Sequence, residues 1–111
     1  MWFVFPQIAG LGRSETSRRY AIASRAEAAA YLQHVLLGPR LIECTQIVVA
    51  TRGRSAIQIF GAGDAMKLQS CMTLFLRAAP GEPLFGRVLD RYFAGVPDRQ
   101  TDLLLRQQGA P

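Results

Sequence analysis

The chain has 111 residues and a formal net charge of +5; half of its residues are hydrophobic and 19% are charged. This composition excludes an intrinsically disordered chain, because the apolar content is high and the charge density is low. Two cysteines cannot cross-link a chain of this length into a disulfide scaffold, and no apolar run approaches the roughly 18 residues of a membrane span. We therefore expect a soluble, globular, single domain over residues 1–111.

The chain begins with a cluster of bulky aromatic residues, which folded domains rarely expose. The segment from Trp2 to Ile8 is predicted to be a short strand or an extended arm. After a glycine-containing loop, Ser14 is a predicted N-cap for a short helix that ends near Ile22. Two explanations of the aromatic start remain open: the segment packs into the core, or residues that precede it are missing.

Two helices are predicted over residues 24–53. Ser24 and Glu27 form a capping-box pattern at the start of the first helix, which should end near Gly38. Pro39 is suited to the first turn of the second helix, which should end at Gly53. Three apolar residues of the second helix recur at helical spacing and predict its inward face: Leu41, Cys44 and Val48.

A short and a long helix are predicted next. Ser55 caps a short helix from Ala56 to Phe60, and Asp64 is the predicted N-cap of the longer helix. The longer helix has one apolar stripe and one polar stripe. The apolar stripe consists of Leu68, Met72, Phe75 and Ala79, and the polar stripe of Gln69, Thr73 and Arg77.

The end of the chain predicts two more helices. Pro80-Gly81 ends the long helix, Pro83 begins an amphipathic helix that ends at Gly95, and Asp98 caps a last helix through Leu105. In total the sequence predicts five to seven helices and at most one short strand. The expected fold class is all-α: a small single multihelical domain with a short extended N-terminal arm.

The aromatic start is the first candidate ligand-binding segment. Trp2 and Phe3 would stack on a planar ligand, while Gln7 would form hydrogen bonds with its polar edge. The alternative interpretation is that the rings belong to the core and that Gln7 satisfies backbone groups.

The second candidate is a polar group on the long helix, formed by Asp64, Lys67, Ser70 and Thr73. Free backbone N–H groups in the first turns of a helix favour anions, so Lys67 and the two hydroxyls would hold a phosphate or a carboxylate. The alternative is an N-cap at Asp64 with a local salt bridge to Lys67. Ser70 lacks the G-x-S-x-G pattern of a nucleophilic serine.

His34 is the one histidine of the sequence. In a regular helix, Glu27, Tyr31 and His34 share one face, and a histidine beside a carboxylate and a phenol can act as a general acid or base. Asp64 is the second candidate for this catalytic role. The alternative for His34 is a favourable interaction with the C-terminal end of its helix.

Several other classes of function are disfavoured. Cys44 and Cys71 stand alone, without the spacing of a metal site, so we expect no metal and no cofactor. The short basic clusters lack the motifs of nucleic-acid-binding domains, and nucleic acid is not an expected partner. Reduced thiols and the lack of a signal peptide favour a cytoplasmic location without membrane association.

Motifs along nearly the whole chain match one bacterial family in the same order. They are Trp2-Phe-Val-Phe-Pro-Gln7, Gly10-Leu-Gly12, Arg19-Tyr-Ala-Ile22, Tyr31-Leu32 with His34, Leu37-Gly38-Pro-Arg40-Leu41, Glu43-Cys44, Ile59-Phe60-Gly61, Asp64-x-x-Lys67 with Ser70, Met72-Thr-Leu-Phe75, and Leu89-Asp-Arg-Tyr-Phe93 with Gly95 and Asp98. On these residues the sequence resembles the family called domain of unknown function 1810.

The resemblance implies an all-helical, mostly cytoplasmic domain of unestablished function. Members usually carry a further helical segment upstream, which we expect this chain to lack. Val35, Ala62-Gly63, Ala65 and Cys71 depart from the family's usual residues; a second aspartate is common where Ala65 stands, and its loss disfavours a two-carboxylate mechanism at that turn. Some members carry the name calpastatin, whose disordered, polar inhibitory segments differ from this half-apolar chain.

Three functions remain open. In the first, the domain binds an anionic or nucleotide-like small ligand through the aromatic start and the polar group of the long helix. In the second, it is a nucleotide or ribosyl hydrolase or transferase, with His34 or Asp64 as the acid/base group. In the third, it is a structural interaction module that forms a homodimer through its aromatic start.

Overall fold

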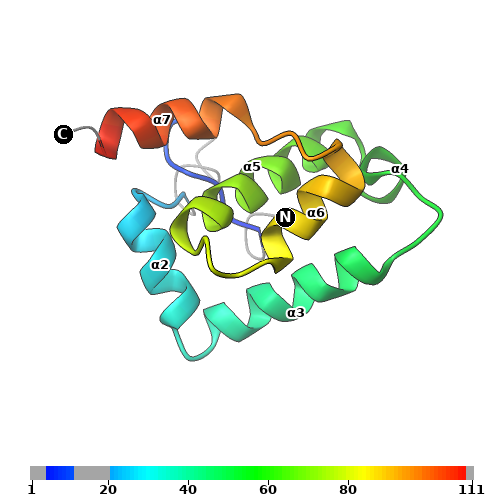
Figure 1. Ribbon diagram of the computed structural model, residues 1–111, viewed down its shortest axis with the longest axis horizontal. Helices are drawn as coiled ribbons and strands as arrows, with labels where there is room; N and C mark the ends of the chain where they lie inside the picture. The colour runs from blue at the N-terminus through cyan, green and yellow to red at the C-terminus, as the bar shows by residue number, and fades with distance from the viewer. Residues whose placement is uncertain (1–4, 12–20, 110–111) are drawn as a thin grey trace.

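The computed structural model describes residues 5–11 and 21–109, and six helices lie within these ranges (Figure 1). In chain order they are α2 (Arg25–Gln33), α3 (Leu37–Ala50), α4 (Ala56–Phe60), α5 (Ala62–Ala78), α6 (Leu84–Phe93) and α7 (Arg99–Gly109). These parts of the chain form no strand beyond one isolated bridge. The all-α prediction is confirmed; residues 12–20, and with them the start of the helix predicted at Ser14, lie outside the described residues.

Helix α5 lies at the centre of the molecule and packs against α2, α4, α6 and α7 (Figure 1). Three residues of its predicted apolar stripe, Leu68, Met72 and Phe75, are each 0% exposed, whereas the fourth, Ala79, follows the last residue of the helix and is half-buried. The ring of Phe75 lies 5.5 Å from the ring of Tyr31 on α2 and 5.7 Å from the ring of Phe85 on α6, measured between centroids. Such aromatic pairs add to the stabilisation from buried area, so one side chain joins three helices.

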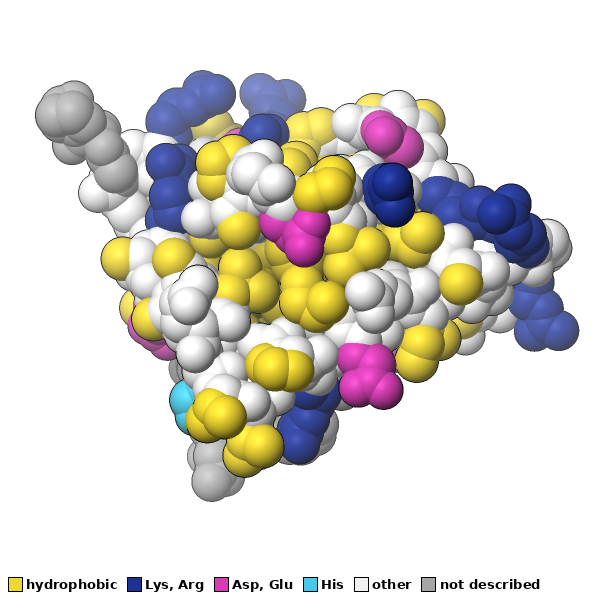
Figure 2. Space-filling model, turned by 60° about the horizontal axis from the view of Figure 1, so that its bottom comes forward, with side chains coloured by type: hydrophobic (Ala, Val, Ile, Leu, Met, Phe, Trp, Pro, Cys, Tyr) yellow, Lys and Arg dark blue, Asp and Glu magenta, His cyan; other side chains and the backbone are white. Residues whose placement is uncertain are grey.

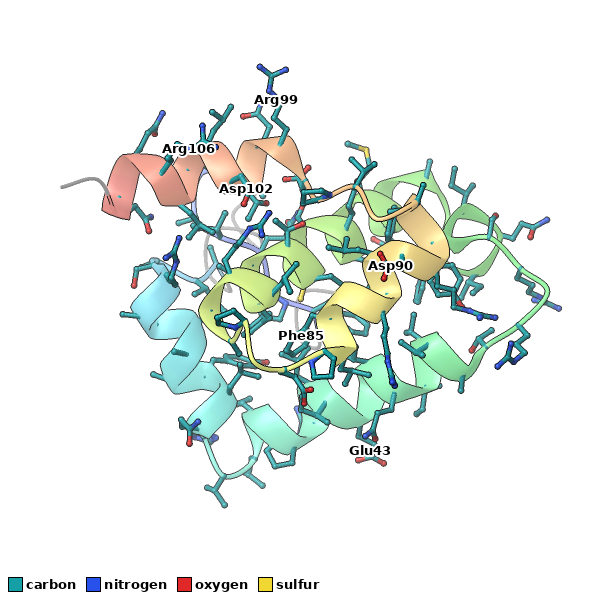
Figure 3. All side chains as sticks on the ribbon, in the orientation of Figure 1. Glu43, Phe85, Asp90, Arg99, Asp102 and Arg106 are labelled. Carbon is teal, nitrogen blue, oxygen red and sulfur yellow. The ribbon has the colours of Figure 1, made fainter. Side chains whose placement is uncertain are left out.

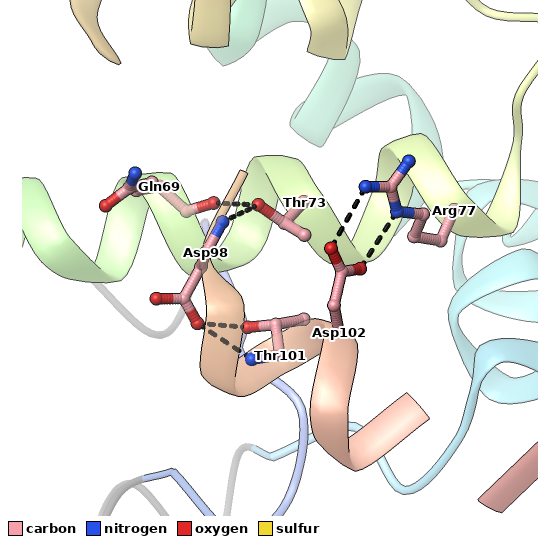
Figure 4. A network of polar contacts seen from close by, with 6 residues as sticks. All are labelled: Gln69, Thr73, Arg77, Asp98, Thr101 and Asp102. Atoms are coloured by element: carbon pink, nitrogen blue, oxygen red, sulfur yellow. Dashed lines mark hydrogen bonds and ion pairs between the residues drawn. The ribbon is translucent and has the colours of Figure 1, made fainter. Parts of the chain in front are cut away.

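The predicted polar stripe of α5 binds the α7 region (Figure 4). The Gln69 side chain donates a hydrogen bond to a carbonyl in the loop before α7, and the hydroxyl of Thr73 accepts one from the Asp98 N–H at 2.8 Å. Arg77 forms a two-point ion pair with Asp102, with N···O distances of 2.9 and 3.0 Å. A stripe that the sequence marks only as polar is therefore the docking face for the last helix.

Three predicted N-caps are confirmed. The hydroxyls of Ser24 and Ser55 each accept a hydrogen bond of 3.1 Å from the backbone N–H three residues on, and the Asp98 carboxylate does so at 2.9 Å. These bonds satisfy N–H groups that have no partner inside the helix. The last helix extends beyond Leu105 to Gly109, further than the sequence predicted.

Gly38 does not end a helix, which corrects the prediction. Helix α2 ends at Gln33, and α3 already begins at Leu37, so Gly38 and Pro39 both lie in the first turn of α3. A Cβ atom built on Gly38 would lie 2.1 Å from the backbone oxygen of Leu32. The glycine is therefore needed for the close approach between the end of α2 and the start of α3.

Two further boundaries differ from the prediction. Helix α3 ends at Ala50 rather than at Gly53, with Thr51 as its C-cap. Asp64 is not an N-cap, because α5 begins at Ala62 and its N-cap is Gly61, whose φ of +82° suits glycine. Asp64 lies instead in the first turn of α5, where a negative charge is favourable.

The described part of the N-terminal arm packs into the core. Phe5 is 5% exposed and Ile8 is 1% exposed. Ile8 forms a parallel bridge with Ile22, through two backbone hydrogen bonds of 2.8 Å between the segments. The prediction of helix as far as Ile22 is therefore wrong at its end, since this residue is extended and pairs with the arm.

Candidate functional site

A hollow of about 480 Å³ lies where the N-terminal arm meets α3, α4 and the start of α5. The side chains around it are mostly apolar: Phe5, Cys44, Ile47, Val48, Thr51, Ile59, Phe60 and Asp64. Its volume is in the usual range for small-molecule sites, which combine an apolar lining with few polar groups. We call it the arm cavity.

The wall of the arm cavity that α3 supplies is held in place from α6. The Tyr92 hydroxyl lies 2.7 Å from the Val48 carbonyl oxygen and 2.8 Å from that of Thr51, so it shares its proton between them. The Arg91 Nε donates a further hydrogen bond of 3.0 Å to the Thr51 carbonyl. The Val48 carbonyl also accepts a longer hydrogen bond of 3.3 Å from the Thr51 N–H, and the bonds from α6 add to it and fix the position of this wall.

Asp64 is the charged residue among the eight that line the arm cavity. Its Oδ1 atom pairs with the Lys67 Nζ one turn later at 3.2 Å, and the Asp64 side chain remains 41% exposed. Oδ2 is not used in this pair, so a carboxylate oxygen remains as an acceptor for a ligand. The pair also places a cation directly beside the cavity lining.

The structure separates the predicted polar group on α5. Asp64 and Lys67 form their ion pair near the arm cavity, whereas Ser70 and Thr73 are buried and do not line it. The Ser70 hydroxyl donates to the carbonyl of Met66 at 3.0 Å, and Thr73 is bound to α7. The two hydroxyls therefore have structural partners and do not converge with Lys67.

The aromatic candidates Trp2 and Phe3 lie outside the described residues. Phe5 belongs to the same segment and does line the arm cavity. The backbone of Gln7 accepts a hydrogen bond of 2.8 Å from the Ile22 N–H. The described part of the arm thus meets the start of α5 in one cavity, through Phe5 and Asp64.

The side chains of Glu27, Tyr31 and His34 have separate partners: Glu27 accepts a hydrogen bond of 3.2 Å from the Ala23 N–H, and the Tyr31 ring packs against Phe75. His34 follows α2 with extended backbone, and its Nδ1 accepts hydrogen bonds from the N–H groups of Leu36 and Leu37 at 3.1 and 3.2 Å. His34 therefore caps the start of α3. The arm cavity adjoins the opposite end of this helix, which is roughly 20 Å long, so His34 and Asp64 do not share a site.

Burial perturbs two ionisable groups near the core. Burial raises the pKa of the Cys71 thiol well above its ordinary value, and it also raises the pKa of the Tyr31 hydroxyl. Both groups are therefore held protonated, and a fully buried thiol is not a reactive nucleophile. Both cysteines are free, and Cys44 is the one that lines the arm cavity.

The sequence did not single out most of the cavity lining. Ile47, Ile59 and Phe60 were assigned to helices but not to a site, since apolar residues at helical spacing are typical of a core. Ile47 is nevertheless 61% exposed, which its place on an apolar helix face does not reveal. Neighbouring residues in the chain gave no signal that α3 and α4 meet the arm here.

Within residues 5–11 and 21–109, no three histidine, cysteine, aspartate or glutamate side chains are grouped in a way that would hold a metal ion. None of the helices in these ranges has the length and apolar character needed to cross a lipid bilayer.

The fold and the arm cavity define a small all-helical domain with an apolar hollow edged by an ion pair. The family model described as "Protein of unknown function (DUF1810)" matches residues 1–105, and the chain belongs to this family. The crystal structure of the conserved hypothetical protein Rv1873 from Mycobacterium tuberculosis is similar to it, with a TM-score of 0.92 and 54% sequence identity. The match covers 94% of this chain and 74% of that one. A search of the curated proteins found no match.

Proposed function

We propose that the domain binds a nucleotide-like small ligand in the arm cavity. The observation that carries the proposal is that Phe5 from the arm, Phe60 from α4 and Asp64 from α5 line the same hollow. A flat heterocyclic base presents two apolar faces and a polar edge. These properties complement a cavity with an apolar lining and one carboxylate.

The sugar that carries such a base would be recognised by Asp64. A carboxylate accepts hydrogen bonds and does not donate them, so it pairs with a donor such as a ribose hydroxyl. The ribose hydroxyls lie close to the phosphate in a nucleotide, so the neighbouring side chains of Asp64 and Lys67 can bind these two parts of one ligand.

The anionic part of the ligand would lie toward Lys67. Its ammonium group is 3.2 Å from Asp64 Oδ1, so it stands at the edge of the cavity that Asp64 lines. An ammonium with several donors can pair with a phosphate while it keeps its contact with the carboxylate. The order of groups along the site would then be base, sugar and phosphate.

Isothermal titration with adenosine, adenosine monophosphate (AMP) and ribose 5-phosphate tests this assignment. We expect AMP to bind best, adenosine to bind more weakly because it lacks the phosphate, and ribose 5-phosphate to bind weakly because it lacks the base. Asp64→Ala should weaken adenosine binding at least tenfold, the effect of losing about 1.4 kcal/mol from a charged hydrogen bond. Equal binding of adenosine by both proteins would contradict the role of Asp64.

A matched pair of variants tests the location. Ile47 and Ile57 are 61% and 62% exposed, but of the two only Ile47 lines the arm cavity. Ile47→Glu places a negative charge in the site and should abolish AMP binding, whereas Ile57→Glu should leave it unchanged. Unchanged binding by Ile47→Glu, or equal loss in both variants, would contradict the proposed site.

A further inference from the structure

A second hollow, of about 210 Å³, lies between α2, α5 and α7, and three arginines line it. Arg25 comes from the first turn of α2, Arg77 from the last turn of α5 and Arg106 from the last turn of α7. The other lining residues are Asp102 and Leu105. Three guanidinium groups and one carboxylate give this hollow a net charge of +2. We call it the arginine hollow.

The arginine hollow is separate from the arm cavity. Arg77 lies near the end of α5 and Asp64 near its start, which are roughly 20 Å apart along the helix. Figure 2 shows Lys and Arg side chains, in dark blue, toward the upper left and at the right of one face of the molecule.

The arginine hollow has a fixed geometry. Both Asp102 oxygens accept from Arg77, through Nε at 2.9 Å and Nη2 at 3.0 Å, so the carboxylate is neutralised and the plane of the guanidinium is set (Figure 4). Nη1 of Arg77 takes no part in this pair. The Gln108 side chain donates to the Ala23 carbonyl, which ties the end of α7 to the residues before α2.

Two charges of the arginine hollow are uncompensated. Among the described residues, neither Arg25 nor Arg106 forms an ion pair, although both lie beside the same hollow and are exposed. Figure 3 shows Asp102 and Arg106 on α7, and Arg99 on the same helix pointing away from the body of the molecule. Gathering like charges is unfavourable unless an anion is present, and these three arginines come from separate helices.

We propose that the arginine hollow binds a phosphate-sized oxyanion, either inorganic phosphate or the phosphoryl group of a phosphomonoester. Arginine is suited to this group, because its planar fork donates two parallel hydrogen bonds to a phosphate. The volume of the hollow, about 210 Å³, is about seven times the roughly 30 Å³ that one water molecule occupies in the liquid. This volume suits a small anion with bound water molecules rather than a whole nucleotide. Arg25 and Arg106 supply the charge, and Arg77 supplies an oriented donor.

Titration with inorganic phosphate at constant ionic strength tests the proposal, with binding followed by the NMR signals of the arginine Nε–H groups. We expect a saturable shift of Arg25, Arg77 and Arg106 in the wild-type protein, and no such shift with chloride or acetate at the same ionic strength. The double variant Arg25→Gln/Arg106→Gln should bind phosphate at least tenfold more weakly. Both residues are exposed, so the fold should persist, and the helical circular dichroism signal checks this.

The matched control removes the same amount of charge elsewhere. Arg52 and Arg54 are exposed in the loop before α4 and do not line the arginine hollow. The Arg52→Gln/Arg54→Gln variant should bind phosphate like the wild type. An equal loss in both double variants would mean general charge attraction and would overturn the site, as would the absence of a saturable shift.

Equal affinities for phosphate and a phosphomonoester indicate recognition of the phosphoryl group alone, whereas tighter binding of the ester identifies the phosphomonoester as the natural source. The proposed function of the arm cavity does not depend on any of these outcomes, because the two sites share no lining residue.

Discussion

The replacement of Gly38 by alanine should destabilise the domain strongly. The added Cβ would lie 2.1 Å from the oxygen of Leu32 and 2.8 Å from its carbonyl carbon, and these are backbone atoms that cannot turn away. Overpacking a well-packed region costs about 1–3 kcal/mol, and a rigid neighbour places this substitution near the upper value. A loss of about 3 kcal/mol lowers the melting temperature of a domain of this size by about 12 °C.

Gly63 offers a matched control for this prediction. It also lies in a helix, but a Cβ atom at Gly63 would meet no heavy atom within 4 Å. Gly63→Ala should leave the melting temperature unchanged or raise it slightly, since alanine has the higher helix propensity. Differential scanning calorimetry of the two variants provides the comparison. If Gly38→Ala melts within about 2 °C of the wild type, the role assigned to this contact is refuted.

Three further substitutions or conditions have defined outcomes. His34→Ala should cost about 1 kcal/mol, because it removes the acceptor that caps α3, and His34→Asn should restore most of the loss; equal melting of all three proteins would contradict this role. Thr73→Val should cost about 1–3 kcal/mol in denaturant titrations, because the Asp98 N–H loses its acceptor, whereas Thr73→Ser should cost less. Burial raises the pKa of Cys71 above 9.0 and that of Tyr31 above 10.0, so the unfolded chain releases these protons at lower pH than the folded chain does. The free energy of unfolding should therefore fall as the pH rises above about 9, and Tyr31→Phe should make the fall above pH 10 shallower; an identical pH profile for this variant would argue against the buried hydroxyl.

Local signals in the sequence predicted much of the helical framework. The caps at Ser24, Ser55 and Asp98 act within three residues, so the chain itself contains both partners of each hydrogen bond. The buried stripe of Leu68, Met72 and Phe75 follows from helical periodicity. These features could be predicted because neither depends on which distant segment packs against the helix.

The boundaries that were wrong depend on distant or three-dimensional contacts. Gly38 has the usual signature of a helix end, and its actual role comes from the approach of the Leu32 carbonyl across a tight turn. Ile22 was predicted to be helical, but its backbone pairs with the arm residues that precede it by more than ten positions. Such pairings leave no mark in the local sequence.

The candidate site was predicted in part. The arm and the start of α5 were singled out, and Phe5 and Asp64 from these two segments do line one cavity. The hydroxyls of Ser70 and Thr73 were assigned to the same site because they follow Asp64 along one helix. They face other neighbours, because nine residues make about two and a half turns at 3.6 residues per turn, so Thr73 lies on the opposite side of α5 from Asp64.

The central claim is that the arm cavity is a binding site for a nucleotide-like ligand. Its most direct test is a methyl NMR titration of the protein, labelled at the isoleucine δ1 positions, with AMP. The account predicts saturable shifts of the Ile47 and Ile59 methyl signals, which line the cavity, and none for the exposed Ile57. Unmoved signals of Ile47 and Ile59 at saturating AMP, or shifts of Ile57 alone, would contradict it.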